Sequence, residues 1–167
     1  MLGVYDAEGF TYELARDGSI ASCIASQVPP GVFAYVPQDN FLFAGTVREN
    51  VAFAASDATN EQIERACKAA CAWDFVKELP LGLDTMIGEH GQGLSQGQLQ
   101  RLAIARAICS GAPIMVLDEV TSALDDATEA AVLANIAALP DKTVFRCRTS
   151  RESSRIRNHA SSCRKMA

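Results

Sequence analysis

Four consecutive apolar residues, Ile114 to Leu117, lie between Pro113 and the acidic pair Asp118-Glu119. Such a run is typical of a central strand in a parallel sheet, which is covered on both faces. Because ligands of open α/β sheets bind at the carboxyl ends of the strands, Asp118 is placed to hold Mg²⁺, directly or through water, and Glu119 to polarise an attacking water. The alternative is that Asp118 only begins a turn and Glu119 is solvated.

A second segment predicts a helix that begins at Ser95. Ser95 and Gln98 have the capping-box spacing, in which the serine bonds the amide three residues on and the glutamine reaches back. Apolar residues then recur at helical spacing from Leu99 to Ile108, which predicts one buried face. Gly97 in the first turn and the positive end of the helix dipole favour the close approach of a phosphate-sized anion. Taken alone, these residues describe only a capped amphipathic helix.

The rest of the chain predicts short strands followed by helices. We expect two short strands within residues 10–30, where Asp17-Gly18 is a turn signal, and a strand over Val32 to Val36. From Arg48 to about Leu83 the pattern is helical, with Thr59 and Gln62 as another capping-box pair. An alanine-rich helix is predicted from Asp126 to Leu139, and a strand from Lys142 to Phe145.

Four of these segments resemble, in order and spacing, the motifs of the ATP-binding-cassette (ABC) ATPases. Tyr35 to Gln38 is similar to the Q-loop, and Leu94 to Gln98 to the signature motif. Ile114 to Glu119 resembles the Walker B strand with its catalytic glutamate, and Ser122 to Asp125 resembles the D-loop. The resemblance implies a P-loop NTPase-type α/β sheet with an inserted helical subdomain over about residues 48–110.

The exporter branch of this family is the most similar. Phe41 to Asn50 resembles the exporter sequence after the Q-loop, and Gly88 to Gly91 lies where exporters carry the X-loop. The resemblance implies ATP and Mg²⁺ as cofactors, a transmembrane permease domain or subunit as partner, and a parent protein at the cytoplasmic face of the plasma membrane. We expect Trp73 and Phe75 to fill the core, with a membrane-domain helix as the alternative contact.

The resemblance also implies a role for each candidate site residue. Glu119 and Gln38 would be catalytic, with Gln38 sensing the γ-phosphate and, together with Asp118, contacting Mg²⁺. The γ-phosphate of ATP held by the opposite subunit of a head-to-tail dimer would be bound by Ser95, Gln96, Gly97 and Gln98. Asp125 would lie at the dimer seam. Phosphoryl transfer needs charge neutralisation and an oriented water more than covalent chemistry, so such groups suffice.

A P-loop is not found in these 167 residues, since no glycine precedes a lysine. Its glycine amides would wrap the phosphates and its lysine would contact the β- and γ-oxygens. The opening segment, Leu2 to Gly9, resembles the family sequence just after the Walker A helix, so we expect the P-loop to lie upstream. We therefore expect a partial ABC ATPase domain over residues 1–145, inactive as an isolated chain.

The last 22 residues differ sharply in charge from the rest. Residues 146–167 hold seven Lys and Arg and one acidic residue, net +6, whereas residues 1–145 carry net −11. Three arginines, Arg146, Arg148 and Arg151, would interrupt a central strand, because charges cannot be buried unpaired. Thr149 lies near the position of the family's γ-phosphate-contacting histidine. We expect a basic tail that is disordered or results from a frameshift after Phe145, with a nucleic-acid-binding arm as the disfavoured alternative.

Composition narrows the remaining choices. The net charge of −5 and the acidic body argue against nucleic acid as the main ligand. No apolar run approaches the roughly 18 residues that span a bilayer. The six cysteines include no C-x-x-C pair, which favours free, buried thiols over a metal site. The expected function is ATP-driven solute transport; a non-catalytic remnant or dimerisation module and a soluble ABC ATPase are the alternatives.

Overall fold

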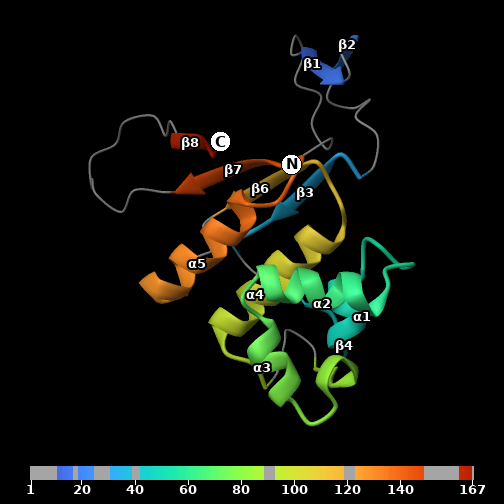
Figure 1. The fold of residues 1–167 in the computed structure, drawn as a ribbon, viewed down its shortest axis with the longest axis vertical. Coiled ribbons are helices and arrows are strands. Elements are labelled where there is room, and N and C mark those ends of the chain that lie inside the picture. Colours follow the sequence, from blue (N-terminus) through green and yellow to red (C-terminus); the bar gives the residue numbers. More distant parts are fainter. Residues whose placement is uncertain are drawn as a thin grey trace.

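The central sheet of this computed structural model has the strand order β3-β6-β7-β8 (Figure 1). The strands are β3 (Phe33–Val36), β6 (Ile114–Asp118), β7 (Thr143–Arg148) and β8 (Ser162–Met166). The first three are parallel to one another, and β8 is antiparallel to β7. The structure describes residues 11–16, 19–24, 31–38, 42–88, 93–118, 123–148 and 162–166. The apolar run thus forms an inner strand of a parallel sheet, as predicted.

Helices α4 (Gln96–Cys109) and α5 (Asp126–Ala137) lie on the same side of this sheet (Figure 1). The connections β3-α4-β6 and β6-α5-β7 move in the same direction across the sheet, and right-handed crossovers place both helices on one face. Met115 and Leu117 are fully buried in the core, whereas Ile114 and Val116 on the opposite face are only partly buried. Within the described residues, β6 is therefore fully buried on one face and not, as expected, on both.

Along the sequence, a group of short helices lies between β3 and α4. It comprises α1 (Val47–Val51), α2 (Asn60–Ala69), α3 (Trp73–Glu78), a 3₁₀ turn η2 (Gly82–Asp84) and a two-residue pairing of β4 (Gly45–Thr46) with β5 (Met86–Ile87). Trp73 and Phe75 pack partly buried against the core, as expected. These elements correspond to the helical region predicted from Arg48 to Leu83.

Within the described residues, three helices begin with a complete capping box. Those of α2 at Thr59 and of α4 at Ser95 were predicted from the S/T-x-x-Q spacing. The third, at Thr46, has the same spacing to Glu49, whose carboxylate accepts the Thr46 backbone N–H at 2.7 Å. Sequence analysis missed it because α1 is only five residues long and shows too little periodicity.

Helix α4 is buried around most of its circumference. Its buried residues include Leu99, Leu102, Ile104 and Ala105, which cannot share one face of a helix. The helix packs against β3, α1 and α2. The single buried face expected from the sequence is therefore an underestimate, because α4 lies between the sheet and the helical region (Figure 1).

A buried polar link joins α1 to α4. The Asn50 side chain is fully buried and donates to the carbonyl oxygens of Phe43 and Thr46, each at 3.0 Å. Arg106 of α4 donates to the Asn50 carbonyl oxygen at 2.8 Å and to its Oδ1 at 2.9 Å. The Arg106 guanidinium also lies 5.6 Å from the Phe43 ring centroid. This network holds residues 43–50, which follow Gln38 in the sequence, against α4.

The arginines of the carboxyl end do not interrupt the sheet. Strand β7 runs through Arg146 to Arg148, and β8 pairs with it. The Arg146 guanidinium lies 3.0 Å from the Glu129 carboxylate of α5, and these side chains are 18% and 16% exposed. The expected interruption of the sheet after Phe145 is therefore wrong. A largely buried charge is tolerated when an opposite charge pairs with it, as Glu129 pairs with Arg146. Strand β8 lies within the tail predicted from charge, while residues 149–161 lie outside the described residues; the disorder of the tail and its origin in a frameshift remain predictions.

The amino-terminal part contains the two short strands that were expected. Strands β1 (Thr11–Arg16) and β2 (Ser19–Ile24) form an antiparallel hairpin on either side of Asp17-Gly18. They make a two-stranded sheet of their own.

Candidate functional site

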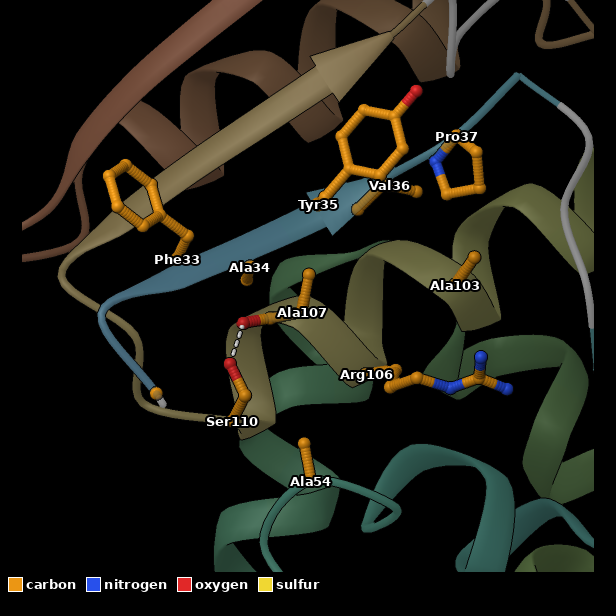
Figure 2. A pocket seen from close by; sticks show the side chains of 11 residues that line it. Phe33, Ala34, Tyr35, Val36, Pro37, Ala54, Ala103, Arg106, Ala107 and Ser110 are labelled. Carbon is orange, nitrogen blue, oxygen red and sulfur yellow. Dashed lines mark hydrogen bonds between the residues drawn. The ribbon is translucent and has the colours of Figure 1, made fainter. Parts of the chain in front are cut away.

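The first group of candidate residues lies at the carboxyl ends of two adjacent parallel strands. Asp118 ends β6, and exposed Gln38 follows β3 by two residues. The Tyr35 hydroxyl donates to Asp118 Oδ2 at 3.0 Å. Figure 2 shows Tyr35 projecting from the face of β3 opposite α4. Glu119 lies outside the described residues.

Tyr35 is a residue whose role sequence reasoning missed. Because Tyr35 is opposite Val116 in the register, Tyr35 and Asp118 emerge on the same face of the sheet. The hydrogen bond restrains the orientation of one carboxylate oxygen, Oδ2. The alternation of side chains along β3, combined with the register, could have indicated that Tyr35 lies beside Asp118. The register, however, can be known only once β3 and β6 are known to pair.

The second group is the amino-terminal end of α4. Ser95 is exposed, and its hydroxyl accepts the Gln98 backbone N–H at 3.2 Å. The Gln98 side chain accepts the Ser95 backbone N–H at 2.8 Å. A hydroxyl that accepts one bond still has its own hydrogen to donate. The side chain of Gln98, in contrast, uses its oxygen in the cap.

The start of α4 suits an anion on physical grounds. The helix has 14 residues, no acidic residue in its first turn, and exposed Ser95 and Gln96 at its tip. The helix dipole places partial positive charge at this tip, and its first backbone N–H groups point outward along the axis.

Asp125 occupies the start of α5. It caps that helix, accepting the Thr128 backbone N–H at 2.9 Å and the Thr128 hydroxyl at 2.7 Å. These two bonds lower the pKa of the exposed Asp125 carboxyl. The residue therefore has a local structural function, and its expected place at a dimer seam remains a prediction.

The comparisons with known proteins agree with this geometry. Residues 13–122 match the family model described as ABC transporter. The chain belongs to the ABC transporter family. It is 46% identical over 136 residues to the ATP-dependent lipid A-core flippase of Thiobacillus denitrificans, a match that covers 81% of this chain and 23% of the flippase. The flippase of the same name from Vibrio cholerae is 50% identical over 115 residues, covering 68% of this chain and 20% of that protein.

Other ABC proteins give the same result. The lactococcin-G-processing and transport ATP-binding protein LagD of Lactococcus lactis is 48% identical over 112 residues, covering 66% of this chain and 16% of LagD. Among solved structures, a bacterial Atm1-family ABC exporter with ATP bound matches with a TM-score of 0.67 and 31% identity, over 77% of this chain and 27% of that one. The chain thus spans about a fifth of the length of its curated relatives, and it has the fold of part of an ABC ATPase domain.

A cavity of about 450 Å³ lies between β3 and α4 of this ABC domain. Its walls are mostly apolar, with Ala34, Val36, Ala103 and Ala107 among them (Figure 2). The Ser110 hydroxyl at its rim donates to the Ala107 carbonyl oxygen at 2.8 Å. The cavity lies on the α4 side of β3, whereas the Tyr35 hydroxyl and Asp118 lie on the other side. It is therefore distinct from the strand-end group.

The cysteines with described side chains are free thiols. Burial raises the pKa of Cys67 to about 12, with smaller contributions from Cys109 and Glu64. Burial likewise raises the pKa values of Cys71 and Cys109. Among the described residues, no group of three or more His, Cys, Asp or Glu side chains could hold a metal ion. No helix in that part of the chain is both long and apolar enough to cross a bilayer.

Proposed function

We propose that this chain is the ATP-binding part of an ABC exporter, which couples the binding and hydrolysis of Mg-ATP to the movement of a solute across a membrane. The names of the relatives support the exporter assignment, since they include lipid A-core flippases and a lactococcin transporter. Its partner would be a transmembrane permease domain or subunit, and the ATP-binding part would lie at the cytoplasmic face of the plasma membrane.

The exposed, capped start of α4 is the observation that carries this proposal. In our proposal, Ser95, Gln96, Gly97 and Gln98 bind the γ-phosphate of ATP held by a second ATP-binding domain in a head-to-tail dimer. Ser95 donates its hydroxyl hydrogen, and the first turn supplies backbone N–H groups and the dipole. Gln98 acts through the cap, because its side-chain oxygen is bonded to the Ser95 backbone N–H.

The strand-end group suits Mg²⁺ bound together with nucleotide phosphates. Mg²⁺ is usually held by one or two carboxylates plus phosphate oxygens and water. Asp118 provides one partly exposed carboxylate with an oxygen fixed by Tyr35, and exposed Gln38 provides an amide near the same sheet edge. Bound Mg²⁺ would neutralise charge on the phosphates. Glu119, directly after Asp118, is proposed to orient the attacking water.

The isolated chain is proposed to be inactive. The phosphate contacts of a P-loop lysine are required for turnover in this class of enzyme, and no glycine-lysine pair occurs in these residues. The chain can still provide the α4 start to a partner that holds ATP.

A mixing experiment tests these proposals. The purified chain is combined with the ATP-binding domain of the Vibrio cholerae relative, and association is followed by sedimentation velocity with and without Mg-ATP. We expect a complex that forms with ATP, and Ser95→Ala is expected to weaken it about ten- to hundredfold, the worth of one hydrogen bond to a charged group. The matched control is Ser56→Ala, at an exposed position outside the site.

Two outcomes would contradict the proposal. If no ATP-dependent complex forms with the unaltered chain, the start of α4 does not act in trans. If the chain alone hydrolyses ATP in a Mg²⁺-dependent reaction that Glu119→Gln abolishes, the proposed inactivity is wrong.

A further inference from the structure

The segment that follows the strand-end group, Ala123 to Asp125, lies directly on the first turns of α4. The first contact is a hydrogen bond in which the Ala123 backbone N–H donates to Gln100 Oε1 at 3.2 Å. Gln100 is only 3% exposed, and it is one of two buried polar or charged residues among those described. A buried amide side chain destabilises the folded state unless it is hydrogen-bonded. The bond to the Ala123 N–H therefore supplies a hydrogen-bond partner for this buried polar side chain.

Gly97 provides a second, independent contact with the same segment. A Cβ atom added at Gly97 would lie 3.0 Å from the Ala123 carbonyl oxygen and 3.3 Å from Leu124 Cδ2. The first of these neighbours is backbone and cannot rotate away. Any larger residue at position 97 would therefore require the Ala123 backbone to shift by a few tenths of an ångström, so the packing of this chain against itself favours glycine there, in addition to any requirement for the close approach of a phosphate.

Arg101 extends the same unit to the helical region. Its Nε donates to the Gly97 carbonyl oxygen at 3.2 Å, and its Nη1 donates to the Cys71 carbonyl oxygen at 2.8 Å. Its guanidinium lies 4.8 Å from the centroid of the Phe75 ring. The first two turns of α4 thus hold the start of α5 on one side and the junction of α2 and α3 on the other.

We propose that Gln100 is a positioning residue that fixes Ala123 to Asp125 against the start of α4, so that Ser95 and Asp125 move as one rigid unit. The contact itself does not depend on the proposed function; only its consequence, that Ser95 and Asp125 meet the same partner, rests on that function. Gln100 itself is buried and acts through the segment that it holds. The neighbouring exposed Gln96 lies on the same helix and makes no such contact with the segment.

Amide hydrogen exchange in the full chain tests the contact directly. In Gln100→Leu, the Ala123 N–H loses its acceptor and is open to water, because Ala123 is otherwise exposed. We expect its exchange rate to rise about three- to tenfold, the worth of one hydrogen bond. The matched control Gln96→Leu removes an amide from the exposed side of the same helix and leaves the rate unchanged. An unchanged Ala123 rate in Gln100→Leu would overturn the proposal.

Two more variants keep the test decisive if Gln100→Leu does not fold. Gln100→Glu, measured at a pH low enough to keep this buried carboxyl uncharged, keeps an oxygen acceptor and removes the amide donors, so it should restore the protection of the Ala123 N–H. Gly97→Ala should displace the Ala123 and Leu124 backbone resonances and lower Tm, although the same change within a free helix raises helix stability. A higher Tm with unmoved resonances would show that position 97 has no close neighbour.

The ATP-dependent complex with the Vibrio cholerae domain measures the consequence. We expect Gln100→Leu to weaken this complex about three- to tenfold while the Ser95 and Gln98 backbone resonances stay unchanged, because the cap of α4 is intact. Equal affinity of Gln100→Leu and unaltered chain would refute the role in assembly. Failure of the unaltered chain to form the complex contradicts the proposed function instead, and the exchange result at Ala123 is independent of it.

Discussion

Ser95 has a structural role in the cap of α4, and its proposed role toward a ligand is compatible with it. Its hydroxyl oxygen accepts a backbone N–H in the cap. Its hydroxyl hydrogen can rotate toward an acceptor that approaches the start of the helix. Tyr35 acts similarly toward Asp118, since the same side chain covers the sheet and orients a carboxylate oxygen. At the residue scale, the candidate site is built from groups that already have a structural partner.

Tyr35→Phe tests the orientation of Asp118. The change removes one hydrogen bond from a side chain that is 45% exposed, so the free energy of unfolding should change by less than about 0.5 kcal/mol. In a fusion that adds the family's P-loop segment ahead of residue 1, so that ATP is held beside Asp118 itself, the Mg²⁺ concentration that half-saturates ATP binding should rise about two- to fivefold, because the carboxylate is no longer held in one orientation. Phe33→Leu, on the same face of β3, is the control. The same Mg²⁺ requirement in Tyr35→Phe and unaltered chain would show that the bond has no such role.

Cys67 predicts a pH dependence of stability. Its pKa is about 12 in the folded chain against an ordinary value of 9.0, so the unfolded state loses this proton first as the pH rises. The stabilisation is complete below pH 9 and is lost as the pH rises toward about 12. The free energy of unfolding should fall by about 1 kcal/mol between pH 7.5 and 10 from this thiol alone. Urea unfolding of the chain and of Cys67→Ala at both values isolates the contribution, and an equal pH dependence in both would contradict it.

At the scale of elements, what the sequence predicted well are the features that depend on neighbours along the chain. The helices after Thr59, Ser95 and Asp125 follow from local spacing. Helix α4 was predicted with one buried face because periodicity does not record that it lies between the sheet and two other helices. The Gln100 contact with Ala123 and the Tyr35 contact with Asp118 were missed for the same reason, since each joins residues far apart in the sequence.

The cap of α2 gives a prediction at this scale. Thr59→Ala removes the acceptor of the Gln62 backbone N–H and should lower the free energy of unfolding by about 1 kcal/mol. Urea denaturation followed by circular dichroism measures the change. Ser56→Ala, at an exposed position just before the helix, should leave the midpoint unchanged. An equal midpoint in both variants would mean that the predicted cap does not stabilise α2.

At the scale of the whole molecule, the carboxyl end is where sequence reasoning was least successful. Charge composition separated residues 146–167 from the rest, yet Arg146 lies within β7 and pairs with Glu129 of α5. Composition counts charges but does not show which of them meet across the fold. The order and fold of the family elements, in contrast, were predicted correctly from motif spacing, because those motifs fix the sequence of strands and helices.

Two truncations separate the contributions of the carboxyl end. A chain ending at Arg148 loses β8, so the outer edge of β7 presents unpaired backbone groups and should favour self-association and a lower free energy of unfolding. A chain ending at Phe145 also loses the pairing of residues 146 and 147 with β6, and it leaves the largely buried Glu129 carboxylate without the Arg146 cation. The broken, partly buried ion pair should account for about 1 to 3 kcal/mol of the further loss of stability. Adding Glu129→Gln to the shorter chain removes that charge and should recover much of this contribution. Urea unfolding and sedimentation distinguish the two steps. Equal stability of both truncations would show that the ion pair contributes nothing. If the chain ending at Arg148 stays monomeric and is as stable as the full chain, β8 does not protect the edge of the sheet.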